Sequence, residues 1–304
     1  MHTFLTPEPI TLEIRNAAGE TQIVLTDTQT TTVVVTPSTS HPLGFLDDVF
    51  KAFGGGRGLG RQFGGRGPWG EQPADAGATQ QAVMDDIVAA VRVEHRDGDN
   101  ATVMVDTDPA RDGWRSSFTV TVTAPTGSHI RLQSQSADVA VTGVAGLVDV
   151  RTASGDVKLD ETTGKTVVQT ASGDVGITGA GAGVDVRTAS GDVATGPVGG
   201  DALIHTTSGD IRVGVVAGNI SARSVSGDVL VSDAVAGQAE VNAVSGDVEI
   251  GVHAGSLASI NLSTVSGHTD TDFEVTGDAP DGDAPVLQIT VKTTSGDIRL
   301  HRAA

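Results

Sequence analysis

A tripeptide, Ser-Gly-Asp, recurs along the C-terminal part of the chain, and its first five copies follow one another at a fixed interval of eighteen residues. The serines of the regular, offset and degenerate copies are Ser136, Ser154, Ser172, Ser190, Ser208, Ser226, Ser245, Ser266 and Ser295. Self-similarity at a fixed period of this kind is the signature of a stacked repeat architecture. One such unit cannot bury its own apolar face, but neighbouring units can bury it together.

The residues around each serine alternate between apolar and polar, as in half-buried strands. Four residues before the serine stand Val150, Val168, Val186, Ile204, Ala222, Val241, Leu262 and Val291. Three residues before it stand Arg151, Gln169, Arg187, His205, Arg223, Asn242, Ser263 and Lys292. A second run of alternating residues follows the tripeptide, starting with Val157 in the first regular copy. Each coil is therefore predicted to be a strand, a corner, a second strand and a return loop.

The corner itself has a direct physical interpretation. Glycine adopts a positive φ angle without steric penalty, and Ser and Asp side chains form hydrogen bonds with nearby backbone groups. We therefore assign a structural role in the turn to Gly155, Asp156, Gly173, Asp174, Gly191, Asp192, Gly209, Asp210, Gly227, Asp228, Gly246, Asp247, Gly296 and Asp297.

These patterns predict an all-β chain: a β-solenoid, or β-helix, of coils of about eighteen residues with an N-terminal β cap region. Cap strands are expected within residues 1–36, a hairpin and entry strands within 81–135, and the repeats within 136–302. Residues 276–285 are expected to form a surface loop before the final strands.

Residues 37–80 differ from the rest because they are rich in glycine and hold five of the nine aromatic residues. Leu46, Val49, Phe50 and Phe53 have the spacing of one stripe on a short amphipathic helix, and Trp69 follows in a basic stretch. One interpretation is a helix that caps the solenoid. The other is a tethered hook for a partner protein or an anionic membrane surface. On this second interpretation Leu46, Val49, Phe50, Phe53 and Trp69 bind the partner.

The charge and composition exclude several classes. The formal net charge of −19 argues against a nucleic-acid-binding protein, because phosphate contacts require a Lys/Arg surface. The absence of cysteine excludes disulfides and thiolate metal sites, and no cofactor motif is present. The N-terminus shows no secretory signal pattern and no apolar run of membrane-spanning length, so a cytoplasmic location is expected.

The repeats, and the ending VLQITVKTTSGDIRLHR at residues 286–302, resemble the bacterial adhesin-like β-strand-repeat family, whose domain is called Toastrack and is a domain of unknown function. The resemblance covers residues 10–35 and 90–302. It implies a β-solenoid with surface, envelope-stress or scaffolding roles, often attached to membrane segments.

A non-enzymatic binding or scaffolding module with a protein partner is therefore the expected function, and its oligomeric state is left open. One alternative is a β-helical polysaccharide-acting enzyme with paired carboxylates. However, the acidic residues recur in every coil, and His205 and His253 are expected to be surface substitutions. A second alternative is calcium binding by the stacked aspartates. A threonine ladder for ice binding is disfavoured, because the threonines two residues before the serine, such as Thr152 and Thr170, have the same parity as the apolar residues and are expected to point inward.

Overall fold

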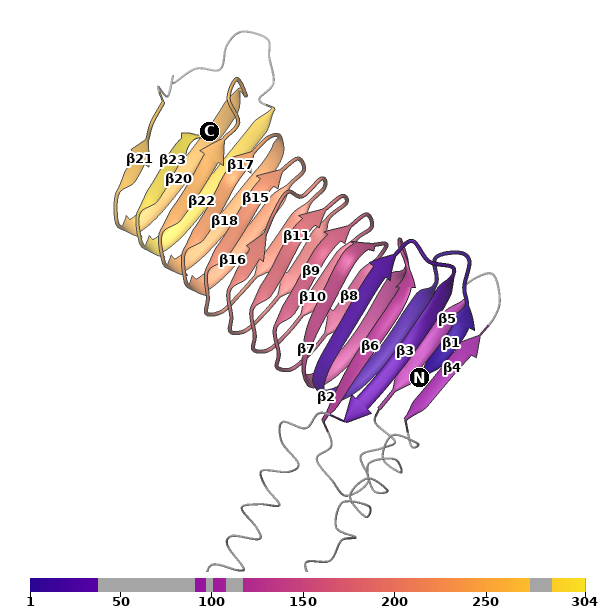
Figure 1. The fold of residues 1–304 in the computed structure, drawn as a ribbon. Coiled ribbons are helices and arrows are strands. Elements are labelled where there is room, and N and C mark those ends of the chain that lie inside the picture. Colours follow the sequence, from indigo (N-terminus) through magenta and orange to yellow (C-terminus); the bar gives the residue numbers. More distant parts are fainter. Residues whose placement is uncertain (38–90, 97–100, 108–116, 274–285, 304) are drawn as a thin grey trace, which may run out of the picture.

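The computed structural model describes residues 1–37, 91–96, 101–107, 117–273 and 286–303, and within these ranges the chain contains strands and no helix. Coils stack along one axis into an elongated solenoid (Figure 1). The predicted all-β solenoid is confirmed.

The strands that precede the corner stack in parallel and form one side of the solenoid, here called the first sheet. The repeat strands of this sheet are β8 (Val148–Arg151), β10 (Thr166–Gln169), β12 (Val184–Arg187), β14 (Ala202–His205), β16 (Ile220–Ser226), β18 (Gly237–Ser245), β20 (Ala258–Ser266) and β22 (Leu287–Ser295).

The strands that follow the corner form the second sheet in the same way. Its repeat strands are β9 (Val157–Thr162), β11 (Val175–Ala180), β13 (Val193–Thr195), β15 (Ile211–Val216), β17 (Val229–Ala234), β19 (Val248–Val252), β21 (Thr269–Thr271) and β23 (Ile298–Arg302).

The period of eighteen residues sets the register between coils. Val150, Val168 and Val186 lie directly opposite one another in successive strands. These inward positions are fully buried, and Ile204 at the same position is 1% exposed. The threonines two residues before the serine, such as Thr152 and Thr170, are also buried, so they face inward as their parity predicts. The core is thus a continuous column of aliphatic side chains, which matches the low aromatic content.

The N-terminal part of the chain takes two different places in the solenoid. Its strands are β1 (His2–Leu5), β2 (Thr11–Thr26), β3 (Thr30–Pro37), β4 (Arg92–Arg96), β5 (Thr102–Asp106), β6 (Phe118–Pro125) and β7 (His129–Ala145). β2 and β7 bend across the corner and run through both sheets. At one end of the stack the pairing is antiparallel: β3 pairs with β1 on one edge and with β6 on the other, and β4 pairs with β5 as the two strands of the expected hairpin.

β2 is not an end strand, although the sequence suggests that it belongs to the cap. It pairs in parallel with β5 and β6 on one edge and with β7 on the other, and so forms an interior coil. The physical reason is that its inward residues Leu12, Ile14 and Ile23 are almost fully buried, which requires a neighbouring coil on each side.

The C-terminal coil is also inserted within the stack. β22 pairs with β18 on one side and with β20 on the other, and β23 lies between β19 and β21. The order along the solenoid therefore differs from the order along the chain. β22 needs cover on both sides because Leu287 and Ile289 are fully buried, whereas Thr269 of β21 is exposed at the end of the stack.

Candidate functional site

The threonine and serine of the repeat build the corner. Oγ1 of Thr152 donates a hydrogen bond to the carbonyl oxygen of Ser154 at 2.8 Å. Thr170, Thr188 and Thr206 make the same bond to the serine two residues later. The same carbonyls also accept the N–H of a glycine in the neighbouring coil, as Ser172 does from Gly155 at 3.2 Å. These hydroxyls therefore close the turn and are not directed at a ligand.

The corner glycines have backbone angles that other residues rarely adopt. Gly155, Gly173, Gly191, Gly209, Gly227, Gly246 and Gly296 have φ angles of +122°, +127°, +126°, +131°, +135°, +142° and +149°. A Cβ atom on Gly209 would lie 2.2 Å from the carbonyl oxygen of Gly191, so the coils also approach too closely for a side chain. Both the dihedral angle and the contact require glycine.

The corner aspartates form a hydrogen-bonded ladder along the stack. In each step Oδ1 of one aspartate accepts the backbone N–H of the aligned residue in the next coil, at 2.8–3.0 Å. The ladder runs through Asp138, Asp156, Asp174, Asp192, Asp210, Asp228, Asp247 and Asp297 and ends on the N–H of His268.

This ladder gives the aspartates a structural task. Their Oδ1 atoms hold backbone groups, while Oδ2 of Asp210 contacts the guanidinium of Arg212 at 2.7 Å. Among the described residues, no three His, Asp or Glu side chains are grouped so that they could hold a metal ion. The arrangement therefore offers no support for the calcium alternative.

The two histidines singled out in the sequence lie on different sheets. His205 is on the outer face of β14, directly opposite Arg187 of β12 and Arg223 of β16. Partial burial lowers the pKa of His205, the charges of Arg223 and Arg187 lower it further, and Asp185 acts in the opposite direction. His253 follows β19 in the second sheet, where its Nδ1 lies 2.8 Å from Oδ2 of Asp233. The fold does not bring the two together as a catalytic pair.

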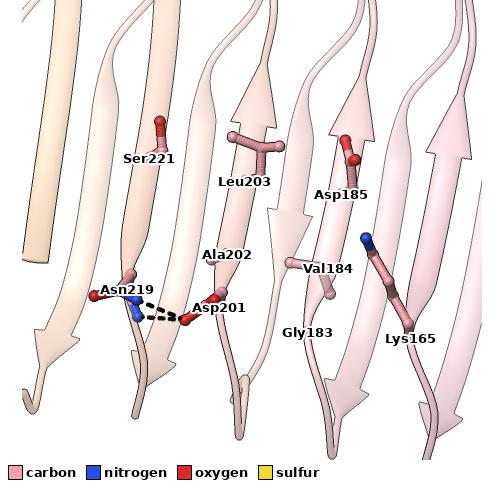
Figure 2. A pocket seen from close by; sticks show the side chains of 9 residues that line it. All are labelled: Lys165, Gly183, Val184, Asp185, Asp201, Ala202, Leu203, Asn219 and Ser221. Carbon is pink, nitrogen blue, oxygen red and sulfur yellow. Dashed lines mark hydrogen bonds between the residues drawn. The ribbon is translucent and has the colours of Figure 1, made fainter. Parts of the chain in front are cut away.

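The outer face of the first sheet carries a hollow of about 480 Å³, open to solvent (Figure 2). Its lining consists of Lys165, Gly183, Val184, Asp185, Asp201, Ala202, Leu203, Asn219 and Ser221. On one side of it, Oδ1 of Asp201 accepts hydrogen bonds from the backbone N–H and Nδ2 of Asn219, at 2.8 and 3.1 Å. This second side-chain ladder stabilises the corner opposite the Ser-Gly-Asp turns.

The predicted partner-binding residues Leu46, Val49, Phe50, Phe53 and Trp69 lie outside the described residues, so both interpretations of the 37–80 insertion stay predictions. The described part of the chain contains no helix with the length and hydrophobicity of a membrane span.

Comparison with known proteins gives three results. No curated protein matches the chain. A crystal structure of a "putative adhesin" from Bacteroides fragilis is 14% identical, with 98% of this chain and 95% of that chain covered and a TM-score of 0.37. A "putative cell adhesion protein" from Clostridium sporogenes is 8% identical, with coverage of 99% and 98% and a TM-score of 0.22. Both TM-scores are low, so neither protein is a guide to the ligand of this chain.

The third result comes from the family models. The Toastrack model, DUF4097, matches residues 115–197 and again residues 184–301. The two matches overlap and together cover the solenoid from β6 to β23, which is more than half of the chain. They also include every Ser-Gly-Asp corner, the feature on which the stacking depends. By its repeats and by this match, the chain belongs to the Toastrack DUF4097 family.

Proposed function

We propose that this protein is a non-enzymatic binding or scaffolding module, which contacts other molecules through the outer faces of its two sheets. The observation that carries the proposal is that the repeated polar side chains are already hydrogen-bonded within the solenoid. The Thr hydroxyls and the Asp Oδ1 atoms bind backbone groups of their own or the next coil. The residues that could carry out chemistry thus hold the solenoid together.

What remains for contact is a pair of long, regular faces. Each outward position repeats once per coil, at about 4.8 Å, so a face offers the same kind of side chain many times along one line. A surface of this kind suits an extended or repeating partner. It offers many weak contacts in place of one enclosed pocket.

The two faces can be tested with a pair of matched leucines. Leu203 of β14 and Leu230 of β17 both occupy half-buried outward positions, one on each sheet. A photoreactive benzophenone amino acid at either position would cross-link to whatever covers that face in cells of the native host. We expect a discrete cross-linked species from one position and little from the other.

The same experiment run on purified chain, without other cell components, is the control for self-association. The proposal is wrong if neither position gives a cross-linked species in cells while both variants keep the melting temperature of the unmodified protein.

A further inference from the structure

The outer face of the first sheet carries a single line of nitrogen-bearing side chains, here called the donor row. In spatial order it consists of Arg15, Gln133, Arg151, Gln169, Arg187, His205, Arg223, Asn242 and Lys292. Every neighbouring pair in this row lies directly opposite in adjacent parallel strands. No carboxylate interrupts the row across these nine coils.

Charge alternates along the donor row. A cation stands in every second coil: Arg15, Arg151, Arg187, Arg223 and Lys292. The coils between them carry a neutral amide or imidazole. The alternation survives both insertions, since Arg15 comes from the inserted N-terminal coil and Lys292 from the inserted C-terminal coil. Neighbouring cations are therefore about 9.6 Å apart, twice the inter-strand spacing.

His205 fits the alternation because it is the uncharged member between two arginines. Its burial and the charges of Arg187 and Arg223 favour the neutral imidazole, against the opposing effect of Asp185. Within the described residues, its Nε2 is buried without a hydrogen-bond partner.

Three arginines of the donor row already make ion pairs that leave their side chains half exposed. Arg151 and Arg187 contact Asp149 and Asp185 in their own strands at 3.2 and 3.3 Å, with the arginine side chains half exposed. Arg223 approaches Glu240 only to 3.9 Å. Arg151 holds Asp149 through both Nε and Nη2, at 3.2 and 3.4 Å. Because the arginine side chains are half exposed, water screens these pairs, and a ligand anion can compete for the guanidinium groups.

The rows on either side leave room for a chain to lie along the donor row. On the corner side stand small or apolar exposed residues: Ala153, Ala171, Ala189, Thr207, Val225, Val244 and Thr294. On the other side, the outward row holds Asp149, Val167, Asp185, Leu203, Ser221 and Glu240. The 480 Å³ hollow lies over Leu203 and Ser221, and its lining includes the carboxylates of Asp185 and Asp201 (Figure 2).

The spacing of the cations selects the kind of anion. Each nucleic-acid strand carries one charge per about 3.4 Å, which is far denser than one cation per about 9.6 Å. An acidic peptide has no fixed period, so its carboxylates would not stay in register over nine coils. A linear acidic polysaccharide with one carboxylate per disaccharide repeats at close to the two-coil distance. Its hydroxyl and amide groups can meet the neutral donors between the cations.

We propose that the donor row binds a linear acidic polysaccharide that carries one carboxylate per disaccharide and lies along the solenoid axis. The inference rests on the proposed binding function and names the ligand class for one face. The polymer places successive carboxylates near Arg151, Arg187 and Arg223, with its sugar rings against the small residues beside the row.

The first experiment measures binding of an alternating glucuronic acid and N-acetylglucosamine oligosaccharide to the full chain by isothermal titration calorimetry. The row variant is Arg151→Gln with Arg187→Gln and Arg223→Gln. The control variant removes three cations from the second sheet, Lys158→Gln with Arg212→Gln and Arg299→Gln, and so changes the net charge equally. We expect the row variant to bind at least about tenfold more weakly than the control variant.

A second variant tests the period separately from the charge. Arg187→Gln combined with Gln169→Arg conserves the net charge but breaks the two-coil alternation. We expect weaker binding than for the unchanged protein. Equal affinity would mean that only the total charge matters and would overturn the proposed match.

Two further probes decide the ligand class. A neutral N-acetylglucosamine oligosaccharide of the same length should not bind, and inorganic polyphosphate should bind no more tightly than the acidic oligosaccharide. Tighter binding of polyphosphate, or an equal loss in the row and control variants, would overturn the assignment to polysaccharide. If the oligosaccharide fails to bind while the Leu203 cross-linker captures a protein, the binding function stands and this inference falls.

Discussion

The backbone N–H of Asp297 donates to Oδ1 of Asp247 at 2.8 Å, although fifty residues separate the two in the chain. The hydrogen bond continues the aspartate ladder from β18–β19 into the inserted C-terminal coil. The intervening coil, β20–β21, is displaced to the end of the stack, where His268 closes the ladder. The last repeat in the sequence is thus the second-last in space.

Because the C-terminal coil is inserted within the stack, replacing either of two aligned isoleucines with aspartate should lower the free energy of unfolding by different amounts. Ile289 of β22 is buried between two strands, whereas Ile260 lies directly opposite it in the end strand β20 and is half-buried. Ile289→Asp should lower the free energy of unfolding by about 3 kcal/mol or more, because it buries an unpaired charge. Ile260→Asp should cost no more than about half of that, because water reaches the end coil. Urea denaturation of both variants measures the difference, and a reversed ranking would mean that the coils stack in chain order.

The corner glycines should tolerate no side chain. Gly209→Ala forces a Cβ to within 2.2 Å of the Gly191 carbonyl oxygen at a φ of +131°, so we expect a loss of at least about 2 kcal/mol. Gly176→Ala is the matched control, because a Cβ there meets no atom within 4 Å and Gly176 lies inside strand β11. That change should be neutral or stabilising by up to about 1 kcal/mol. Thermal melts compare the two, and similar destabilisation by both would contradict the close coil contact.

The aspartate ladder should depend on an acceptor atom and not on the negative charge. Asp192→Ala leaves the N–H of Asp210 without the Oδ1 that it now contacts at 2.9 Å, at a cost of about 1 kcal/mol. Asp192→Asn keeps an acceptor oxygen at that place and should change the stability by less than about 0.5 kcal/mol. Amide hydrogen exchange at Asp210 gives a local readout, since it should quicken in the Ala variant only. Equal exchange in both variants would remove the ladder's structural role.

The charge of His205 should change below the usual pH for histidine. Burial together with Arg223 and Arg187 lowers its pKa, so the folded state resists protonation. Its contribution to stability is therefore present above the unfolded pKa of about 6.5 and is lost as the pH falls below it. A proton NMR titration of the ring should give a midpoint below 6.5, and Arg223→Ala should raise that midpoint. A midpoint at or above the ordinary value in the unchanged protein would show that the two arginines do not act on the ring.

The features that could be predicted from the sequence are those that depend on interactions within a single coil. The alternation around Ile204 and the recurring Gly209 and Asp210 report local backbone geometry, and local geometry repeats in every coil. The solenoid, its inward positions and its need for glycine corners can therefore be inferred from the period alone. The burial of Thr152 and Thr170 also follows from parity.

The stacking order could not be inferred in the same way. Parallel coils accept any neighbour with the right register, and the step from Ser245 to Ser295 contains no signal that the copy at Ser266 is bypassed. The same holds for β2, whose partners β6 and β7 lie about a hundred residues away in the chain.

The sequence by itself determined the repeat, the corner chemistry and the two faces of every strand, because these depend on neighbours within one coil. Only the tertiary structure decided which coils meet, because the burial of residues such as Leu12 and Ile289 requires cover on both edges of their strands. The period alone aligns the donor row from Arg151 to Asn242, whereas Arg15 and Lys292 extend its alternation only because both chain ends are inserted into the stack.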